Sequence, residues 1–155
     1  MPMCLASTSA LIGGIGEDVS PVTGLAGLFI VAVNPRQPIS TPEVFASYAK
    51  LCEWENSYKV RPLPSASPPP KTSEAWLEVI AKRTNDLQPA ASLLCPDISQ
   101  IAGQVAAQNG CQIARMSGSG ATVFGLFLAR QEADQARANL QAEWPDWWVK
   151  SAELM

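Results

Sequence analysis

Histidine is absent from this sequence of 155 residues, and charged residues make up only 16% of it. Without an imidazole, the chain cannot supply a Ser-His-Asp triad, a Cys-His pair or a histidine-containing zinc site. The 11 basic residues against 14 acidic ones give a net charge of −3, which argues against binding to nucleic acid or to an acidic membrane. The chemistry left open is that of carboxylates, lysine, hydroxyls and backbone amides.

Long apolar runs and closely spaced cysteines are also lacking. The longest apolar run, residues 25–33, is far shorter than the roughly 20 residues that span a bilayer. The four cysteines are widely separated, which favours free thiols in a reducing compartment over a metal site or disulfides. The first basic residue is Arg36, so the sequence shows no charged start of a secretory signal. These features predict a cytoplasmic protein.

The length and the 47% apolar content predict one folded domain. Its first third is typical of strands. Short apolar segments at 3–6 and 10–15 are separated by glycines, and 25–33 is a continuous run rich in Val and Ile. Such a run favours a strand that is buried on both faces.

The next segment contains a helix start and then a concentration of prolines. Ser40 and Glu43 fit a capping box, so a helix is predicted over 41–51. Prolines are frequent between 62 and 70, and we predict a surface loop with polyproline II character over 61–72. An SH3-type ligand is the alternative interpretation of these prolines.

The remainder alternates helical and strand patterns. Apolar spacing and capping residues predict helices over 74–83, 89–94, 97–108 and 131–143, with Thr72 or Ser73 as one N-cap and Asn109-Gly110 as one helix end. Strands are predicted over 111–116, 122–128 and 147–154. This order favours an antiparallel α+β sandwich over a doubly wound parallel sheet.

Three segments contain residues suited to chemistry. Residues 115–124 include Ser-Gly-Ser-Gly, which can present backbone N–H groups and hydroxyls to an anion but also occurs in hairpins that bind nothing. Residues 33–45 form a turn and a helix cap, with Phe45 as a candidate core residue. In 83–87 the Asn-Asp pair is typical of a cap, although Asp86 is also a candidate catalytic carboxylate.

Taken together and in order, these segments resemble the C-terminal half of the 4-diphosphocytidyl-2-C-methyl-D-erythritol kinases, a family within the GHMP small-molecule kinases. The resemblance covers nearly the whole chain. It depends on Pro-Met-Cys-Leu at 2–5, Gly-Ile-Gly-Glu at 14–17, Asn-Pro at 34–35, Ser-Thr-Pro-Glu-Val-Phe at 40–45, Asn-Asp-Leu-Gln-Pro at 85–89, and Met-Ser-Gly-Ser-Gly-Ala-Thr-Val-Phe at 116–124.

The resemblance implies an α+β fold in which helices cover an antiparallel, ferredoxin-like sheet. Residues 1–35 would end the central region that joins an ATP-binding half. Residues 36–155 would form the GHMP kinase C-terminal domain, with the Pro-rich surface loop at 61–72. Two other functions remain open: a GHMP kinase for another small alcohol, and a non-catalytic module whose proline-rich loop binds a partner.

The activity implied is ATP-dependent phosphorylation of the 2-hydroxyl of the diphosphocytidyl substrate in non-mevalonate isoprenoid biosynthesis, with Mg²⁺. By position, Phe45 would stack on the cytosine and Thr41 would lie beside the substrate; stacking of this kind contributes about 1–3 kcal/mol per base. The glycine motif near the phosphates would comprise Ser117, Gly118, Ser119, Gly120, Ala121 and Thr122.

The sequence departs from the family at its charged catalytic residues. The lysine motif and the glycine-rich ATP loop of the family have no counterpart, and the family's aspartate would fall just before Met1. We therefore expect a truncated product or a misassigned start. An exposed apolar patch, where the other half would pack, is expected to favour self-association.

We predict that this chain alone has no measurable kinase activity, because neither charged catalytic residue of the resembled family is present. Turnover of ATP with the diphosphocytidyl substrate by a purified sample would contradict this. The coding DNA upstream of Met1 tests the truncation itself. The absence there of an in-frame Gly-Ala-Asp and of a glycine-rich loop would reject it.

Overall fold

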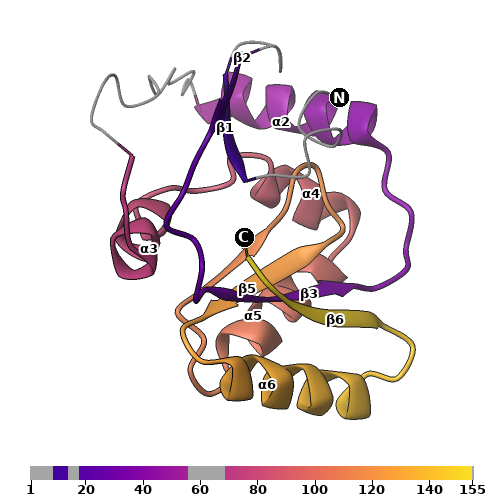
Figure 1. Ribbon diagram of the computed structural model, residues 1–155. Coiled ribbons are helices and arrows are strands. Elements are labelled where there is room, and N and C mark those ends of the chain that lie inside the picture. Colours follow the sequence, from indigo (N-terminus) through magenta and orange to yellow (C-terminus); the bar gives the residue numbers. More distant parts are fainter. Residues whose placement is uncertain (1–8, 14–17, 56–68, 155) are drawn as a thin grey trace.

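The computed structural model describes residues 9–13, 18–55 and 69–154. Its larger sheet has four antiparallel strands in the order β4-β5-β3-β6, and a separate two-stranded sheet pairs β1 with β2 (Figure 1). The strands are β1 (Ala10–Gly13), β2 (Asp18–Pro21), β3 (Phe29–Asn34), β4 (Ile113–Met116), β5 (Val123–Phe127) and β6 (Trp148–Glu153). Antiparallel pairing throughout confirms the predicted α+β class.

The helices agree closely with the sequence prediction. They are α2 (Thr41–Glu55), α3 (Ser73–Ala81), α4 (Gln88–Leu94), α5 (Asp97–Ala106) and α6 (Arg130–Glu143). Ser40 Oγ accepts a hydrogen bond from the Glu43 N–H at 3.4 Å, and Thr72 Oγ1 accepts one from the Ala75 N–H at 3.3 Å. Both predicted N-caps are therefore in use. Across the described residues, none of the helices has the length and apolar character needed to cross a membrane.

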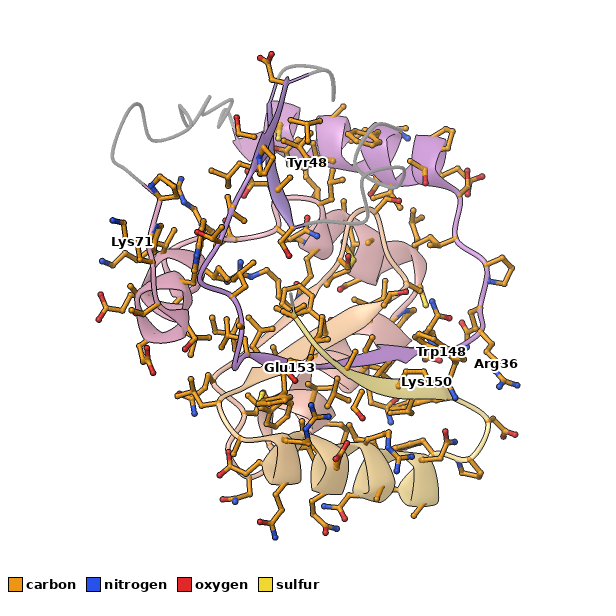
Figure 2. All side chains as sticks on the ribbon, in the orientation of Figure 1. Arg36, Tyr48, Lys71, Trp148, Lys150 and Glu153 are labelled. Atoms are coloured by element: carbon orange, nitrogen blue, oxygen red, sulfur yellow. The ribbon has the colours of Figure 1, made fainter. Side chains whose placement is uncertain are left out.

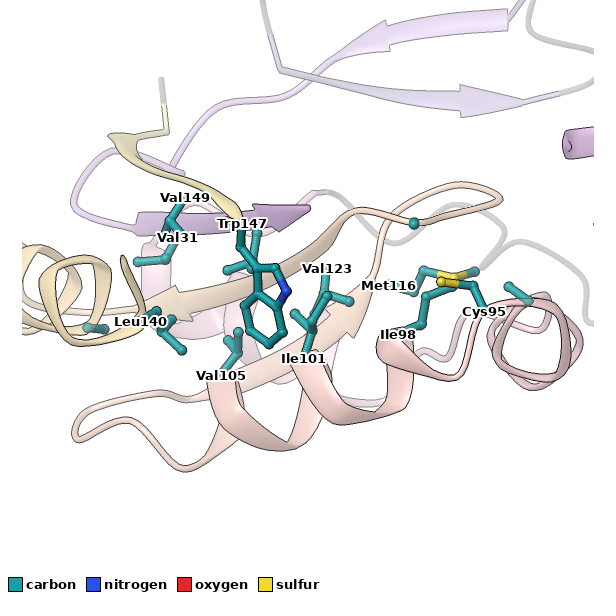
Figure 3. Close-up of a cluster of buried hydrophobic side chains, with 14 of the residues drawn as sticks. Val31, Cys95, Ile98, Ile101, Val105, Met116, Val123, Leu140, Trp147 and Val149 are labelled. Atoms are coloured by element: carbon teal, nitrogen blue, oxygen red, sulfur yellow. The ribbon is translucent and has the colours of Figure 1, made fainter. Parts of the chain in front are cut away.

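One face of the larger sheet packs against α5 and α6 to form the main core (Figure 3). Because side chains alternate along a strand, Val31 and Val33 point to the same face of β3, and both are completely buried. The helices contribute apolar side chains at helical spacing to the same cluster. These are Ile98, Ile101 and Val105 from α5 and Ala133, Ala136 and Leu140 from α6.

A smaller cluster lies on the opposite face of the sheet, where α3 packs. Trp76 and Leu77 of α3 are buried together with Leu28 and Leu126. The Trp76 indole N–H also donates to the Thr23 carbonyl at 2.8 Å, which satisfies the polar atom of a buried aromatic ring.

The prediction that 25–33 forms a strand buried on both faces needs correction. The Leu28 N–H donates to the Leu25 carbonyl at 3.0 Å, so these residues form a turn and the strand begins at Phe29. Its second face is only half-buried, because α3 covers part of it.

The structure also differs from other local predictions. The helix predicted over 97–108 ends at Ala106, and Gly110, with φ +78°, lies in the turn that leads into β4. β2 was not predicted, because its sequence Asp-Val-Ser-Pro has little strand character. The predicted strand at 3–6, the end of the one at 10–15 and most of the loop at 61–72 lie outside the described residues.

The division of the chain at residue 35 stays a prediction. In the structure, β3 from the first segment is hydrogen-bonded between β5 and β6 of the second. Residues 29–34 therefore belong to the same sheet as the strands that follow.

Contacts at both ends of α6 stabilise its packing against β6. Trp144 and Trp147 stack with ring centroids 4.5 Å apart and planes inclined by 9°. At the other end, Arg130 forms a 2.6 Å ion pair with Glu153 and lies over the Phe29 ring. Both charged groups are exposed, so this ion pair contributes at most about 1 kcal/mol and apolar burial dominates.

We expect Leu140→Ala in α6 to lower the free energy of unfolding by about 2–5 kcal/mol, because the side chain is 0% exposed and its removal leaves a cavity. Urea unfolding at equilibrium measures the change. Leu93→Ala is the matched control. Its side chain is 66% exposed, and we expect a change within about 0.5 kcal/mol. Equal effects at the two positions would contradict this description of the core.

Candidate functional site

The connection between β4 and β5, residues 117–122, forms a tight turn that we call the glycine turn. The Ser117 N–H donates to the Thr122 carbonyl at 2.8 Å, and the Gly120 N–H donates to the Ser117 carbonyl at 3.1 Å. Gly118 and Gly120 adopt φ values of +57° and +95°, a region that side chains other than hydrogen disfavour. The local geometry therefore explains both glycines.

The two glycines differ in what surrounds them. A Cβ atom added at Gly120 would lie 3.0 Å from Met116 Sδ and 3.2 Å from Ile98 Cδ1, whereas one at Gly118 would meet nothing within 4 Å. Gly120 therefore packs the turn onto the core. Gly118 faces open space, where a ligand could approach the backbone.

The segment after β3 contacts this turn at two points. Thr41 Oγ1 and Ser119 Oγ are hydrogen-bonded at 2.8 Å, and Asn34 Nδ2 donates to Thr122 Oγ1 at 2.9 Å. Thr41 therefore lies against the glycine turn. An open depression of about 360 Å³ lies beside them, lined by Asn34, Arg36, Gln37, Pro38, Ile39, Gly120 and Ala121.

Phe45 occupies an exposed position one helical turn after Thr41. Its side chain is 54% exposed, whereas that of the neighbouring Val44 is completely buried. Residues four apart lie on the same face of a helix, so Phe45 and Thr41 share one face of α2. The alternative that Phe45 is a core residue is therefore wrong, and its ring is free to contact a ligand.

A second segment holds the glycine turn from the other side. Asn85 Nδ2 donates to the carbonyls of Met116 and Gly118, both at 2.8 Å, and Asn85 Oδ1 accepts the Leu87 N–H at 3.0 Å. Gln88 Oε1 accepts the Met116 N–H at 3.0 Å. Sequence reasoning interpreted Asn85 as a cap alone, because contacts across about thirty residues of chain leave no local signal.

The structure gives Asp86 no catalytic setting. Its side chain is exposed and accepts a hydrogen bond from Thr84 Oγ1 at 2.9 Å. That contact is local and is typical of a turn between helices.

Two arginines are relevant to charge near the turn: Arg36 lines the depression beside the turn, and Arg115 precedes the turn in β4. The Arg115 guanidinium donates to the Ile80 carbonyl at 2.9 Å, and burial lowers its pKa, although arginine remains a cation at neutral pH. Figure 2 shows Lys71 beside α3 and Lys150 on β6, apart from the glycine turn. The described residues contain no group of three or more Cys, Asp or Glu side chains that could hold a metal ion.

Comparison with known proteins identifies this architecture. Residues 71–146 match a family model described as "GHMP kinases C terminal". These residues, about half of the chain, are therefore similar to the C-terminal domain of GHMP kinases. The glycine turn, the Asn85 segment and the helices α3 to α6 all lie within the matched residues.

The relatives extend the match over the rest of the chain. The chain is 40% identical over 154 residues to a protein from Roseobacter denitrificans named 4-diphosphocytidyl-2-C-methyl-D-erythritol kinase, covering 99% of this chain and 49% of that relative. A crystal structure of 4-(cytidine 5′-diphospho)-2C-methyl-D-erythritol kinase superposes with a TM-score of 0.67 at 27% identity, covering 98% of this chain and 52% of that one. The chain thus spans about half the length of the curated relatives that it matches.

A further structure shows that the fold is shared more widely. Homoserine kinase from Cytophaga hutchinsonii superposes with a TM-score of 0.69, covering 99% of this chain and 50% of that one, at only 18% identity. This likeness concerns the fold of the GHMP kinase domain alone.

We expect Gly120→Ala to lower the free energy of unfolding by about 1–3 kcal/mol more than Gly118→Ala, because only the first also forces a methyl group against Met116 and Ile98. Both variants carry the cost of a positive φ, about 1 kcal/mol. Urea unfolding of the two variants side by side measures the difference. A Gly118→Ala variant that is the less stable of the two would contradict the assignment of the open side.

Proposed function

We propose that this chain is the substrate-binding half of an ATP-dependent kinase that phosphorylates the 2-hydroxyl of 4-diphosphocytidyl-2-C-methyl-D-erythritol in non-mevalonate isoprenoid biosynthesis. The observation that supports this most is the 2.8 Å contact between Thr41 and Ser119. It joins the face of α2 that carries Phe45 to the glycine turn. The named relatives, which match over nearly the whole chain, support the choice of substrate.

In this proposal the exposed ring of Phe45 stacks on the cytosine. Aromatic side chains bind bases through their faces, and a ring that is not needed in the core is available for this role. Thr41, one turn earlier on the same helix face, lies between the base and the glycine turn. The diphosphate would extend from the stacked base toward residues 117–122.

The glycine turn would act on the phosphates through backbone amides and hydroxyls. Phosphoryl transfer depends mainly on positioning and on neutralising charge, and preorganised N–H donors supply part of both. The hydroxyls of Ser119 and Thr122 are already oriented by Thr41 and Asn34. This chain would therefore orient the substrate without an imidazole.

The remaining catalytic parts would come from the ATP-binding half expected upstream, including the lysine and the aspartate. ATP is the phosphate donor of the proposed reaction. No group of three or more Cys, Asp or Glu side chains among the described residues could hold a metal ion alone, and Mg²⁺ would be held mainly by the phosphates of ATP in the ATP-binding half. A cytoplasmic location, predicted from the sequence, is part of the same proposal.

Self-association of this chain is a further part of the proposal. Leu11 and Ile12 of β1 and Leu93 and Leu94 of α4 are large apolar side chains exposed to solvent. Exposed apolar surface of this kind favours association with another protein surface. Size-exclusion chromatography over a range of concentrations tests it, and a clean monomer throughout would count against it.

We expect Phe45→Ala to weaken the binding of cytidine diphosphate by about 1–3 kcal/mol, the contribution of one stacked base. Titration calorimetry with the folded chain measures this. Phe45→Tyr, which keeps an aromatic face, should bind nearly as well as the wild type. Unchanged affinity in Phe45→Ala, or an equal loss in both variants, would reject stacking at this position.

A further inference from the structure

We infer that Asn85 is a positioning residue, which holds the glycine turn in the shape that binds a phosphate group. This inference rests on the proposed function for its relevance to catalysis, but it concerns a residue to which the resemblance assigns no role. The hydrogen bonds of Asn85 join the segment before α4 to Met116, the last residue of β4, and to Gly118 in the glycine turn.

The side-chain amide of Asn85 is almost fully used in this structure. Its two N–H groups donate to the carbonyls of Met116 and Gly118, and its oxygen accepts the Leu87 N–H. Two carbonyls on one side require a donor, and an N–H on the other requires an acceptor, so the orientation of the amide is determined. An aspartate has the same shape but cannot donate at neutral pH.

The hydrogen bonds from Asn85 use backbone carbonyl groups and leave backbone N–H groups of the glycine turn available. With its carbonyl bonded to Asn85, Gly118 is fixed beside Ser119, and the N–H groups of Gly118 and Ser119 donate to no acceptor among the described residues. Consecutive N–H groups in such a turn form a concave site for anions. Because Gly118 faces open space, a phosphate can reach these two amides.

Gln88, the first residue of α4, provides a matched comparison because it bonds to the same hairpin. Its Oε1 accepts the Met116 N–H, and a glutamate at this position would still accept that bond. Asn85→Asp and Gln88→Glu both add one negative charge to the same segment with almost no change of shape. Only the first places a carboxylate against two carbonyl oxygens.

The test is a titration of the ¹⁵N-labelled chain with inorganic pyrophosphate, followed through the amide resonances of Gly118 and Ser119. We expect Asn85→Asp to weaken this binding at least about tenfold, since charged groups depend strongly on oriented donors. Gln88→Glu should weaken it only about two- to threefold, through charge alone. Asn85→Ala, which removes the bonds without adding charge, should show the same loss and serves if Asn85→Asp does not fold.

A second titration, with cytidine and with cytidine diphosphate, separates positioning from general stability. In Asn85→Asp, the affinity for cytidine should stay within about twofold of the wild type. The additional affinity with which the wild type binds cytidine diphosphate rather than cytidine should be lost. A parallel loss of affinity for both ligands would show a merely structural role and overturn the inference. Absence of pyrophosphate binding in the wild type, or equal binding in Asn85→Asp and Gln88→Glu, would also overturn it.

The results expected if the proposed function fails differ from those expected if the inference about Asn85 fails. If the wild type binds pyrophosphate at Gly118 and Ser119 in an Asn85-dependent way but shows no affinity for cytidine, the positioning role stands and the cytidyl substrate is rejected. If cytidine binds in a Phe45-dependent way and the Asn85 variants leave pyrophosphate binding unchanged, the positioning role is rejected and the substrate assignment stands.

Discussion

β3 is hydrogen-bonded along both edges, to β5 and to β6, and this pairing determines where the candidate site lies. Val31 and Val33 fix the strand against the main core, so its last residue, Asn34, reaches the end of the hairpin next to it. There its amide meets Thr122. The chain then continues directly into α2, which brings Thr41 and Phe45 to the same end of the sheet. Strand pairing therefore positions the site before any ligand is involved.

The sequence indicated the helices well, because their signals are local. Ser40 and Thr72 cap as expected, and the apolar stripe of α5 faces the core. Strand limits were predicted less well, since they depend on partners distant in the chain. The turn between Leu25 and Leu28 shortens an apolar run that otherwise suggests one long strand. β2 is a strand only because β1 pairs with it, and its own residues do not favour one.

The candidate site was predictable in part, for the same reason. The glycines of residues 117–122 indicated a turn with free backbone, and the motif at 40–45 indicated a helix start. Neither pattern could show that Thr41 and Ser119 touch, nor that Phe45 is exposed while Val44 is buried. The greatest omission was Asn85. As a local motif it is a cap, and its bonds to Met116 and Gly118 exist only because the fold brings the segment before α4 to the β4–β5 hairpin.

The tryptophans have a practical consequence. Trp144 and Trp147 form a stacked pair where α6 meets β6, whereas Trp76 lies alone in the cluster under α3. Near-ultraviolet circular dichroism depends on how tertiary packing fixes aromatic side chains, so the part of that signal lost when Trp144 and Trp147 are replaced should follow the packing of one face of the sheet. The emission of Trp76, isolated by replacing the other indoles, should follow the opposite face. Each side of this protein thus contains its own optical reporter, and the order in which the two faces form can be observed without an added label.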